Sequence, residues 1–325
     1  QFARGQSSNP GILAQTTVTW RTTAYLTGGL RRERVDQPRG ATQRAFLPMA
    51  GVSIVRDYEN FSMKWRGAYG RGIRAPGSSL HLATREPRRT IRNDGLTPEE
   101  QSGVEAGVDV RVGSALGVHL TWFDQMVSGL IQTVTVDNPN DGNSGPSRSS
   151  WYQFQNVGEI SNRGWESQAV YALGAFRLSG AASFVDSRVR RVAAQYTGDL
   201  RPGDRMLAVP ARTLSVSGGW ARPQYHASIT VSRASDWINY DRLRIAQALV
   251  RDSIDADDLT GAQLRSFWTD YSGTTRLRAS ASREMWRGVT MHITGENLLG
   301  HQRDEPDTIT IVPGRTLSFG VRARF

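Results

Sequence analysis

The sequence predicts an all-β fold, an antiparallel up-and-down transmembrane β-barrel that contributes about 13 strands from this chain. Three observations predict it. Strand-like segments alternate apolar and polar residues, their connections alternate between short and long, and many segments exceed the usual five or six residues of globular strands. A transmembrane helix is excluded, since no run approaches the roughly 18 apolar residues that it needs.

The composition is compatible with this fold but does not by itself predict it. The chain has 325 residues, of which 38% are apolar, and its mean hydropathy is -0.45. A barrel needs lipid-facing side chains only at every second position, so a mild hydropathy is compatible with membrane insertion. A soluble β protein remains the alternative. The absence of cysteine removes disulfides, thiol nucleophiles and thiolate metal sites.

The net charge of +10 is carried almost wholly by arginine, because Lys64 is the only lysine. Such a charge attracts polyanions, which include nucleic acid, lipopolysaccharide and anionic solutes. The arginines are scattered through alternating segments and loops and form no recognition helix. We therefore expect no nucleic-acid partner.

The last nine residues show the alternation most clearly. Their apolar members are Leu317, Phe319, Val321, Ala323 and Phe325, while Ser318, Gly320, Arg322 and Arg324 occupy the other face. A strand with hydrocarbon on one side and water on the other has this pattern, although the edge strand of a soluble sandwich would share it. Further clean alternation occurs at 61–65, 116–122, 214–220, 225–232 and 289–293.

The connections predict two unlike rims. Short turns are expected near 22–23, 59–60, 113–114, 174–175, 222–224 and 287–288. Long polar connections are expected near 36–45, 74–98, 137–150, 193–207, 240–263 and 299–307. Outer-membrane barrels have short periplasmic turns and long external loops in this order. The segment from Tyr240 to Leu264 is read as a loop with room for a short helix.

Aromatic residues are expected near strand ends, where they would form interfacial girdles. The residues are Trp20, Trp65, Tyr69, Trp122, Trp220, Tyr225, Trp286 and Phe325. A general preference of Trp and Tyr for strands is the alternative explanation.

Whether the number of strands is odd or even adds a further expectation. Because the first and last strands should both run toward the periplasm, an odd number of strands cannot close, and the chain is expected to be the C-terminal part of a larger barrel.

Five local motifs resemble one family. They are Arg74-Ala75-Pro76; Leu96-Thr97-Pro98-Glu99 followed by Glu105 and Gly107; Asn156-Val157-Gly158 followed by Gly164-Trp165-Glu166; Glu296-Asn297-Leu298-Leu299; and Pro313-Gly314-Arg315-Thr316 leading into the terminal strand. In their order and spacing over residues 45–325 they are similar to the C-terminal portion of a TonB-dependent outer-membrane receptor.

The resemblance implies a barrel of about 22 strands that holds an N-terminal plug. It also implies uptake driven by the TonB complex through a peptide near the N-terminus. Residues 1–325 would be the C-terminal part of one barrel domain, with plug and peptide not present in this sequence. The implied protein binds and imports a nutrient such as a ferric siderophore, cobalamin or a saccharide. A passive porin or adhesin-type barrel is the alternative.

Two sets of residues are candidate sites. Arg85, Arg88, Arg89 and Arg92 form the densest basic cluster. Together with the inward-pointing Arg322 and Arg324, they could bind an anionic ferric chelate. The alternative is that they bind lipopolysaccharide phosphates or pair with Glu86 and Asp94. The resemblance further implies that Leu317, Phe319, Val321 and Phe325 are read by the barrel-assembly machinery, with simple contact to outer-membrane lipid as the alternative.

No pattern predicts an enzyme, a cofactor or a metal site. The histidines, at 81, 119, 226, 292 and 301, lack metal-ligand spacing and are expected in the lumen or loops. The acidic cluster of Asp252, Asp255, Asp257 and Asp258 lacks the glycine and final glutamate of an EF-hand and reads as a solvated loop. Glu99 and Glu100 stand beside a strand start without a nucleophile. Lipid-facing positions are predicted at Val231 and Val289.

Overall fold

A computed structural model describes residues 10–36, 42–76, 90–136, 151–250, 259–286, 288–302 and 312–323. Within these residues one antiparallel sheet of 13 strands dominates the fold. Its members, in spatial order, are β1 (Gly11–Trp20), β2 (Ala24–Asp36), β3 (Thr42–Tyr58), β4 (Phe61–Arg74), β6 (Glu99–Val112), β7 (Leu116–Ser128), β10 (Gly158–Leu173), β11 (Phe176–Val192), β12 (Arg212–Arg222), β13 (Tyr225–Ser235), β16 (Thr274–Trp286), β17 (Val289–Glu296) and β18 (Thr316–Ala323).

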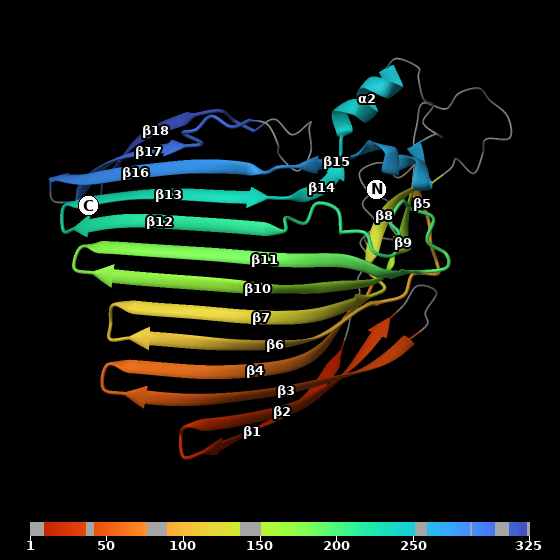
Figure 1. Cartoon of the computed structure of the whole chain (residues 1–325), viewed down its shortest axis with the longest axis horizontal. Coiled ribbons are helices and arrows are strands. Elements are labelled where there is room, and N and C mark those ends of the chain that lie inside the picture. Colours follow the sequence, from red (N-terminus) through yellow and green to blue (C-terminus); the bar gives the residue numbers. More distant parts are fainter. Residues whose placement is uncertain are drawn as a thin grey trace.

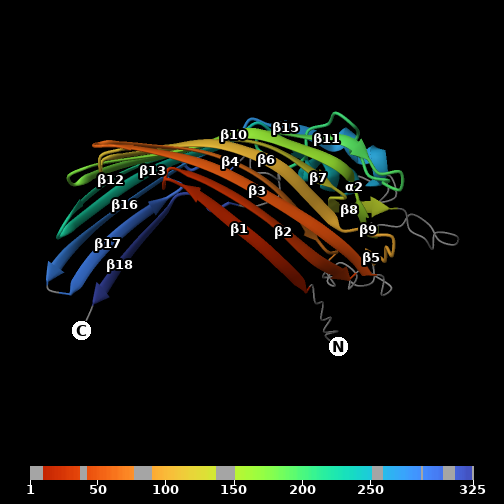
Figure 2. The ribbon, with the colours of Figure 1, turned by 90° about the horizontal axis from the view of Figure 1, so that it is seen from below.

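The sheet is an up-and-down arch, in which each strand pairs with the sheet strand before and after it in sequence (Figure 1). Figure 2 shows its curvature, with β1 and β18 as the two edge strands. Both edge strands run toward the same rim, as parity predicted, because an odd number of antiparallel strands separates their ends. The predicted all-β architecture and its strand number are therefore confirmed.

The two rims differ as predicted. Tight turns join β1 to β2, β3 to β4, β6 to β7, β10 to β11, β12 to β13 and β16 to β17 at the left-hand rim of Figure 1. Residues of positive φ make several of these turns, among them Thr22 at 54°, Gly113 at 53° and Gly174 at 57°. The long connections share the opposite rim. Strands β2 and β3 extend further than predicted, so that only residues 37–41 separate them.

Small elements fold within the long connections. One extra sheet contains β5 (Thr90–Ile91), β8 (Ile131–Val136) and β9 (Trp151–Asn156), and a second pairs β14 (Trp237–Tyr240) with β15 (Trp268–Tyr271). The segment from Tyr240 to Leu264, predicted as a loop with room for a short helix, contains α2 (Arg242–Val250) and the beginning of the 3-10 helix η5 (Gly261–Phe267). Among the described residues no helix has the length and apolar character needed to cross a membrane.

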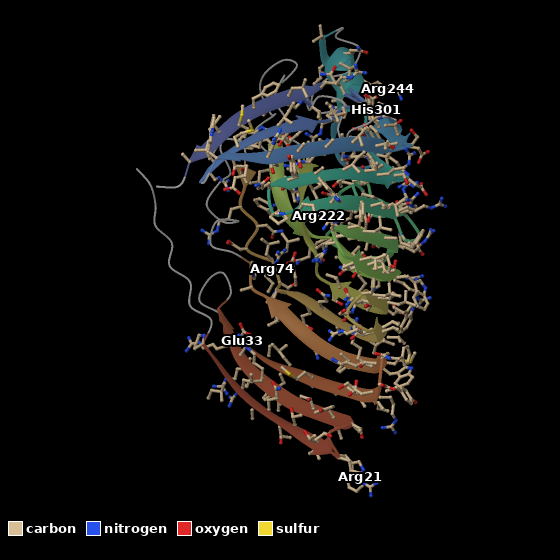
Figure 3. All side chains as sticks on the ribbon, turned by 90° about the vertical axis from the view of Figure 1, so that its left-hand side faces the viewer. Arg21, Glu33, Arg74, Arg222, Arg244 and His301 are labelled. Atoms are coloured by element: carbon tan, nitrogen blue, oxygen red, sulfur yellow. The ribbon has the colours of Figure 1, made fainter. Side chains whose placement is uncertain are left out.

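The two faces of the main sheet have opposite character. The outer face is apolar, and on the last strand Leu317, Phe319 and Val321 are 62%, 76% and 65% exposed. The same face continues across the sheet through Val231, Val216, Leu178, Trp165 and Leu120, as the strand registers show. The inner face carries mainly Ser, Thr and charged residues. It lines the concave side of the arch, on which Arg74 is labelled in Figure 3.

The aromatic prediction is confirmed only in part. Trp20, Trp220, Tyr225 and Trp286 lie on the outer face beside the tight turns, and the rings of Trp220 and Tyr225 are 6.2 Å apart. Trp122, however, is the midpoint of β7 and lies far from either rim. Its position reflects the fit of a large ring to a lipid-facing strand, which is the alternative that the sequence had left open.

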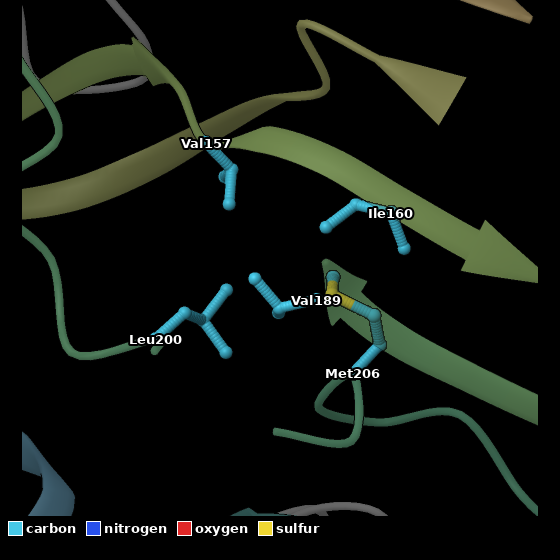
Figure 4. Packing of buried hydrophobic residues seen from close by; sticks show 5 residues of the cluster. All are labelled: Val157, Ile160, Val189, Leu200 and Met206. Atoms are coloured by element: carbon cyan, nitrogen blue, oxygen red, sulfur yellow. The ribbon is translucent and has the colours of Figure 1, made fainter. Parts of the chain in front are cut away.

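A compact apolar core lies at the rim of the long connections. Figure 4 shows its buried members, Val157, Ile160, Val189, Leu200 and Met206. They come from the junction of β9 with β10, the start of β10, the end of β11 and the connection 193–211. Burial of these side chains fixes that connection against the sheet, since each buried aliphatic side chain contributes about 1.5–3 kcal/mol.

Candidate ligand-binding face

A polar network occupies the inner face where β4, β6 and β7 adjoin. Arg66 donates a hydrogen bond from Nη2 to Oγ1 of Thr121 over 2.5 Å, and its Nε lies 3.5 Å from Oδ1 of Asp109. The same carboxylate oxygen lies 2.9 Å from Nδ1 of His119. Strand alternation explains the cluster, because Gly107, Asp109, His119 and Thr121 occupy adjacent inward positions.

An inner-face cavity of about 510 Å³ adjoins this network, lined by Arg66, Glu105, His119, Thr121, Phe123, Gln125, Glu166, Ser167 and Gln168. Gln125 donates to Oε1 of Glu105 over 3.2 Å, and Gln101 donates to Oε1 of Gln125 over 2.9 Å. The lining therefore offers both cations and anions together with amide groups. Such a surface can exchange hydrogen bonds with a polar solute.

Gly164, in the Gly-Trp-Glu motif, allows close packing within this face. A Cβ at this position would lie 2.7 Å from Cζ of Phe123 and 2.2 Å from the carbonyl oxygen of Phe184. Phe123 is 9% exposed, and it covers the glycine from the neighbouring strand. The glycine of the motif thus has a packing role, which its sequence context alone did not reveal.

Arg322 faces inward, as the alternation predicted. It lines a separate cavity of about 610 Å³ with Ser282, Glu284, Gly288, Thr290 and His292. This cavity lies beside the tight turn between β16 and β17, whereas Arg92 lies in the connection that follows β4 at the other rim. The length of the strands therefore separates Arg322 from Arg92.

Arg92 pairs locally. Its Nε lies 2.5 Å from Oδ1 of Asp94, a partner that the sequence had offered as the alternative to ligand binding. Arg85, Arg88, Arg89 and Glu86 lie outside the described residues, as do Arg324, Phe325, His81 and the acidic cluster at 252–258. His119, His226 and His292 lie on the inner face and His301 in a loop, as predicted. The described residues contain no group of three or more His, Asp or Glu that could hold a metal ion.

A buried carboxylate organises the connections at the long-loop rim. Asp199 is 4% exposed. Its Oδ2 accepts a hydrogen bond of 2.8 Å from the Tyr240 hydroxyl and one of 2.6 Å from Nε1 of Trp268. The connection 193–211 is thereby joined to both strands of the β14–β15 pair. Burial raises the pKa of Asp199, although the two donated hydrogen bonds act in the opposite direction.

Arg265 supports the same arrangement from the 3-10 helix η5. Its Nη1 and Nη2 donate to the two carboxylate oxygens of Asp204 over 2.5 and 2.6 Å, and Nη1 also reaches the carbonyl oxygen of Asp199 over 3.1 Å. Its guanidinium lies 4.3 Å from the ring centroid of Trp268. The hydrogen bonds from Arg265 hold the pKa of Asp204 below its usual range, while burial raises the pKa of Tyr196 to about 12.

A cavity of about 430 Å³ opens between these loop elements. It is lined by Gln132, Thr133, Val134, Thr135, Tyr152, Tyr196, Gly198, Asp199, Tyr240, Arg242, Ile245, Leu259 and Leu264. The lining combines aromatic rings and aliphatic side chains with a few polar groups, as small-molecule sites commonly do. Sequence reasoning missed this cavity, since its walls come from five separate segments of the chain.

Several of the family-like motifs contact one another. Arg74 forms an ion pair with Glu99, whose Oε1 also accepts a 2.8 Å hydrogen bond from the Ile131 backbone. Asn156 bonds to the backbone of Thr97. At the other end of the sheet, Asn297 has a positive φ of 47°, and its Nδ2 donates to the carbonyl oxygens of His301 and Pro313 over 2.9 Å each. These motifs fix the bases of the long connections.

An arch of long amphipathic strands, apolar outside and polar inside, with tight turns at one rim and folded loops at the other, defines part of the wall of an outer-membrane β-barrel. Residues 1–298 match the family model described as TonB dependent receptor-like, beta-barrel. The chain therefore belongs to the TonB-dependent receptor β-barrel family, which resides in the bacterial outer membrane. A comparison with curated proteins found no match.

Solved structures agree with the fold. The chain is similar to the siderophore receptor PirA from Acinetobacter baumannii, with a TM-score of 0.68, 14% identity and coverage of 98% of this chain and 46% of that one. It is also similar to the copper transporter OprC, with a TM-score of 0.67, 15% identity and coverage of 97% of this chain and 47% of that one. The similarity to the FrpB iron transporter from Neisseria meningitidis, F5-1 variant, has a TM-score of 0.65 and 17% identity, and it covers 98% of this chain and 46% of that one. This chain thus spans less than half the length of each.

Proposed function

We propose that this chain is the C-terminal part of the barrel of a TonB-dependent receptor that imports a metal chelate, such as a ferric siderophore, across the outer membrane. The observation that carries the proposal is the continuous polar inner face, because a barrel wall needs such a lining only if polar solute or protein fills its interior. The structural similarity to a copper transporter, an iron transporter and a siderophore receptor supports a metal-containing substrate. Coupling to the TonB complex would use a region outside this chain.

The inner-face network suits transient contact with an anionic chelate. Arg66 offers a fixed guanidinium beside the cavity, and Thr121 and Asp109 hold it in place. The acids Glu105 and Glu166 in the same lining keep the site from being purely cationic. A mixed lining of this kind favours weak binding and release over tight capture, which is what a transport path requires.

The folded loops give the external rim an ordered surface on which the substrate can first bind. Asp199, Tyr240 and Trp268 join two long connections, and the adjacent cavity of about 430 Å³ has the size range of small-molecule sites. Cobalamin and saccharides are the alternative substrates that the uptake test includes, since the lining combines aromatic with polar groups.

The test uses the full-length protein that contains this chain, in a strain lacking other receptors for the same nutrient. Uptake of radiolabelled iron and copper chelates, cobalamin and maltodextrin is measured with and without a functional TonB complex. The proposal expects saturable, TonB-dependent uptake of one metal chelate, and Arg66→Gln to lower it about tenfold at equal receptor abundance. Unsaturable passage independent of TonB would instead support the passive porin.

A further inference from the structure

A concentration of arginine lies on the outer face at the long-loop ends of β11, β12 and β13. The set comprises Arg188, Arg190, Arg205, Arg212 and Arg233, and is called the arginine patch below. Strand register places these residues outward. Arg212 is paired with the exposed Phe184, Arg233 is paired with the exposed Leu214, and Arg188 follows Phe184 by an even number of positions.

Two further contacts unite the patch. Arg188 forms an antiparallel bridge with Arg205, which brings the connection 193–211 alongside the end of β11. Arg190 donates from Nε to Oγ of Ser161 over 2.7 Å, and Ser161 is the register partner of Arg188. All five arginines therefore lie on one side of the sheet, with Arg212 and Arg233 level with Phe184 and Leu214, and with Arg188 and Arg190 further along toward the long-loop rim.

The acids near the patch neutralise only part of its charge. Asp186 pairs with Arg188 at 2.8 Å, and Asp236 pairs with Arg205 at 2.9 Å. Arg233 donates to neutral groups, Oγ1 of Thr275 and the carbonyl oxygen of Ser272. Within the described residues no carboxylate pairs with Arg190, Arg212 or Arg233. These three exposed guanidiniums can each still donate to an external anion.

The patch lies at the upper limit of the lipid-facing surface. Leu178 and Phe184 on β11 are 52% and 53% exposed on the outer face, and the outward positions that follow are Asp186 and Arg188. Since a strand rises about 3.3 Å per residue, Arg188 lies about 13 Å along the strand beyond the last apolar ring. That displacement takes the guanidinium of Arg188 out of hydrocarbon and into the headgroup layer. Arg212 and Arg233 are level with Phe184 and Leu214, and an arginine at this depth reaches the headgroup layer by extending its long side chain along the apolar surface.

This layer belongs to the outer leaflet, because the long connections of outer-membrane barrels face outward. The outer leaflet of a bacterial outer membrane carries lipopolysaccharide, whose lipid A phosphates lie at the level of the headgroups. We propose that the arginine patch is a lipopolysaccharide-binding site on the barrel exterior. Its guanidiniums donate bidentate hydrogen bonds to lipid A phosphates, while the exposed Phe184 and Leu214, which pair with Arg212 and Arg233, contact the acyl chains.

The charged residues between the patch and β7 on the outer face form balanced ion pairs. Arg163 pairs with Asp124 at 2.6 Å and Arg191 with Glu159 at 2.5 Å, both on the outer face. These neighbours are balanced pairs and add little net charge. The excess of cations, and therefore the phosphate site, is confined to the patch itself.

The test measures binding by the full-length protein, purified in a neutral detergent and immobilised. Three detergent-dispersed probes are compared: lipopolysaccharide with intact lipid A phosphates, the same lipopolysaccharide after phosphatase treatment, and phosphatidylglycerol. The variant replaces Arg190, Arg212 and Arg233 with Gln. The matched control replaces Arg56, Arg222 and Arg283, which are outward-facing arginines beside the tight turns, with Gln. Heat-modifiable mobility on gels verifies that each protein is folded.

We expect the variant to bind intact lipopolysaccharide about tenfold more weakly and the control to stay within about twofold of the unmodified protein. Phosphatase-treated lipopolysaccharide should bind the unmodified protein as weakly as intact lipopolysaccharide binds the variant. Equal affinity of variant and unmodified protein would overturn the proposal. So would equally tight, equally patch-dependent binding of phosphatidylglycerol, which would assign the patch to phospholipid. If the triple variant fails to fold, R190Q/R212Q decides by the same criteria, because it retains the hydrogen bonds of Arg233.

Discussion

Thr97 and Asn156 exchange a reciprocal pair of hydrogen bonds across 59 positions of sequence. The Thr97 amide donates to Oδ1 of Asn156 over 2.9 Å, and Nδ2 of Asn156 donates to the Thr97 carbonyl oxygen over 3.0 Å. The same Nδ2 reaches the Gly129 carbonyl oxygen over 2.6 Å. One side chain, 3% exposed, thus joins the connection before β6 to both ends of the connection between β7 and β10.

Replacement of Asn156 by Ala should destabilise this rim. The change leaves the amide and carbonyl of Thr97 and the carbonyl of Gly129 without their partner, at a cost of about 1–3 kcal/mol. The urea midpoint of the folded full-length protein in detergent should fall, while the matched change Asn60→Ala at an exposed tight turn should leave it unchanged. Equal midpoints for the two variants would show that the hydrogen bonds of Asn156 do not stabilise the rim.

Gly164→Ala should impair assembly of the barrel. The added Cβ meets a backbone oxygen at 2.2 Å, so that the pairing of β10 with β11 must shift. Overpacking of this kind costs about 1–3 kcal/mol or more. The fraction of protein with folded, heat-modifiable mobility should drop, and Phe123→Ala should not restore it because the closest atom belongs to Phe184 backbone. Gly180→Ala is the control, since its nearest neighbour lies at 3.7 Å; a similar loss there would contradict the steric explanation.

Much of the fold could be predicted from the sequence because membrane-spanning strands obey a local rule. Alternation assigns each residue of 317–323 to a face without knowledge of its neighbours, and the structure confirms those faces for Leu317, Phe319 and Val321. Tight turns are likewise local, since a few residues such as Gly113 and Gly174 supply the backbone conformation. The number and order of the strands follow from the alternation and the tight turns together.

The folded loops could not be predicted in this way. Asp199 looks like any loop acid in the sequence, and only the approach of Tyr240 and Trp268 from residues about 40 and 70 positions away buries it. Local density of arginine at 85–92 likewise does not show which cations are left for a ligand, since Arg92 pairs with Asp94 two positions along the chain. Arginines that are far apart in sequence, such as Arg190, Arg212 and Arg233, meet only through strand pairing.

Asp199→Asn should change how the stability of the long-loop rim depends on pH. Burial raises the pKa of Asp199 above the ordinary 3.8, so the folded state binds more protons than the unfolded state from about pH 3.8 up to the raised pKa. The unmodified protein therefore loses stability as the pH rises through that window, and the amide variant lacks this loss. The lowered pKa of Asp204 acts oppositely but is common to both proteins and cancels in the comparison.

Hydrogen exchange of the backbone amides in residues 193–211, corrected for intrinsic rates, measures this effect in the full-length protein. The protection of the Asn variant relative to the unmodified protein should grow as the pH rises from about 4 and then become constant. Asp270→Asn, at an exposed position of β15, is the control and should show no such trend. A pH-independent difference for the Asp199 variant would mean that burial does not raise the pKa of this carboxyl group.

Val231→Arg tests which face of the sheet contacts lipid. Val231 is 42% exposed on the outer face and lies in the middle of β13, where an arginine in hydrocarbon costs about 2–4 kcal/mol. Ser215→Arg is the matched control, because Ser215 faces inward from the neighbouring strand and pairs with Ser232 and Ala181.

Val289→Arg should have a smaller effect than Val231→Arg. Although the sequence predicts that both valines face lipid, Val289 is the first residue of β17 and lies beside a tight turn, where the penalty falls to about 0–1 kcal/mol. The yield of folded full-length protein in the outer membrane should therefore fall most for Val231→Arg, less for Val289→Arg and least for Ser215→Arg. A greater loss from Ser215→Arg than from Val231→Arg would reverse the assignment of the two faces, and with it the exterior position of the arginine patch.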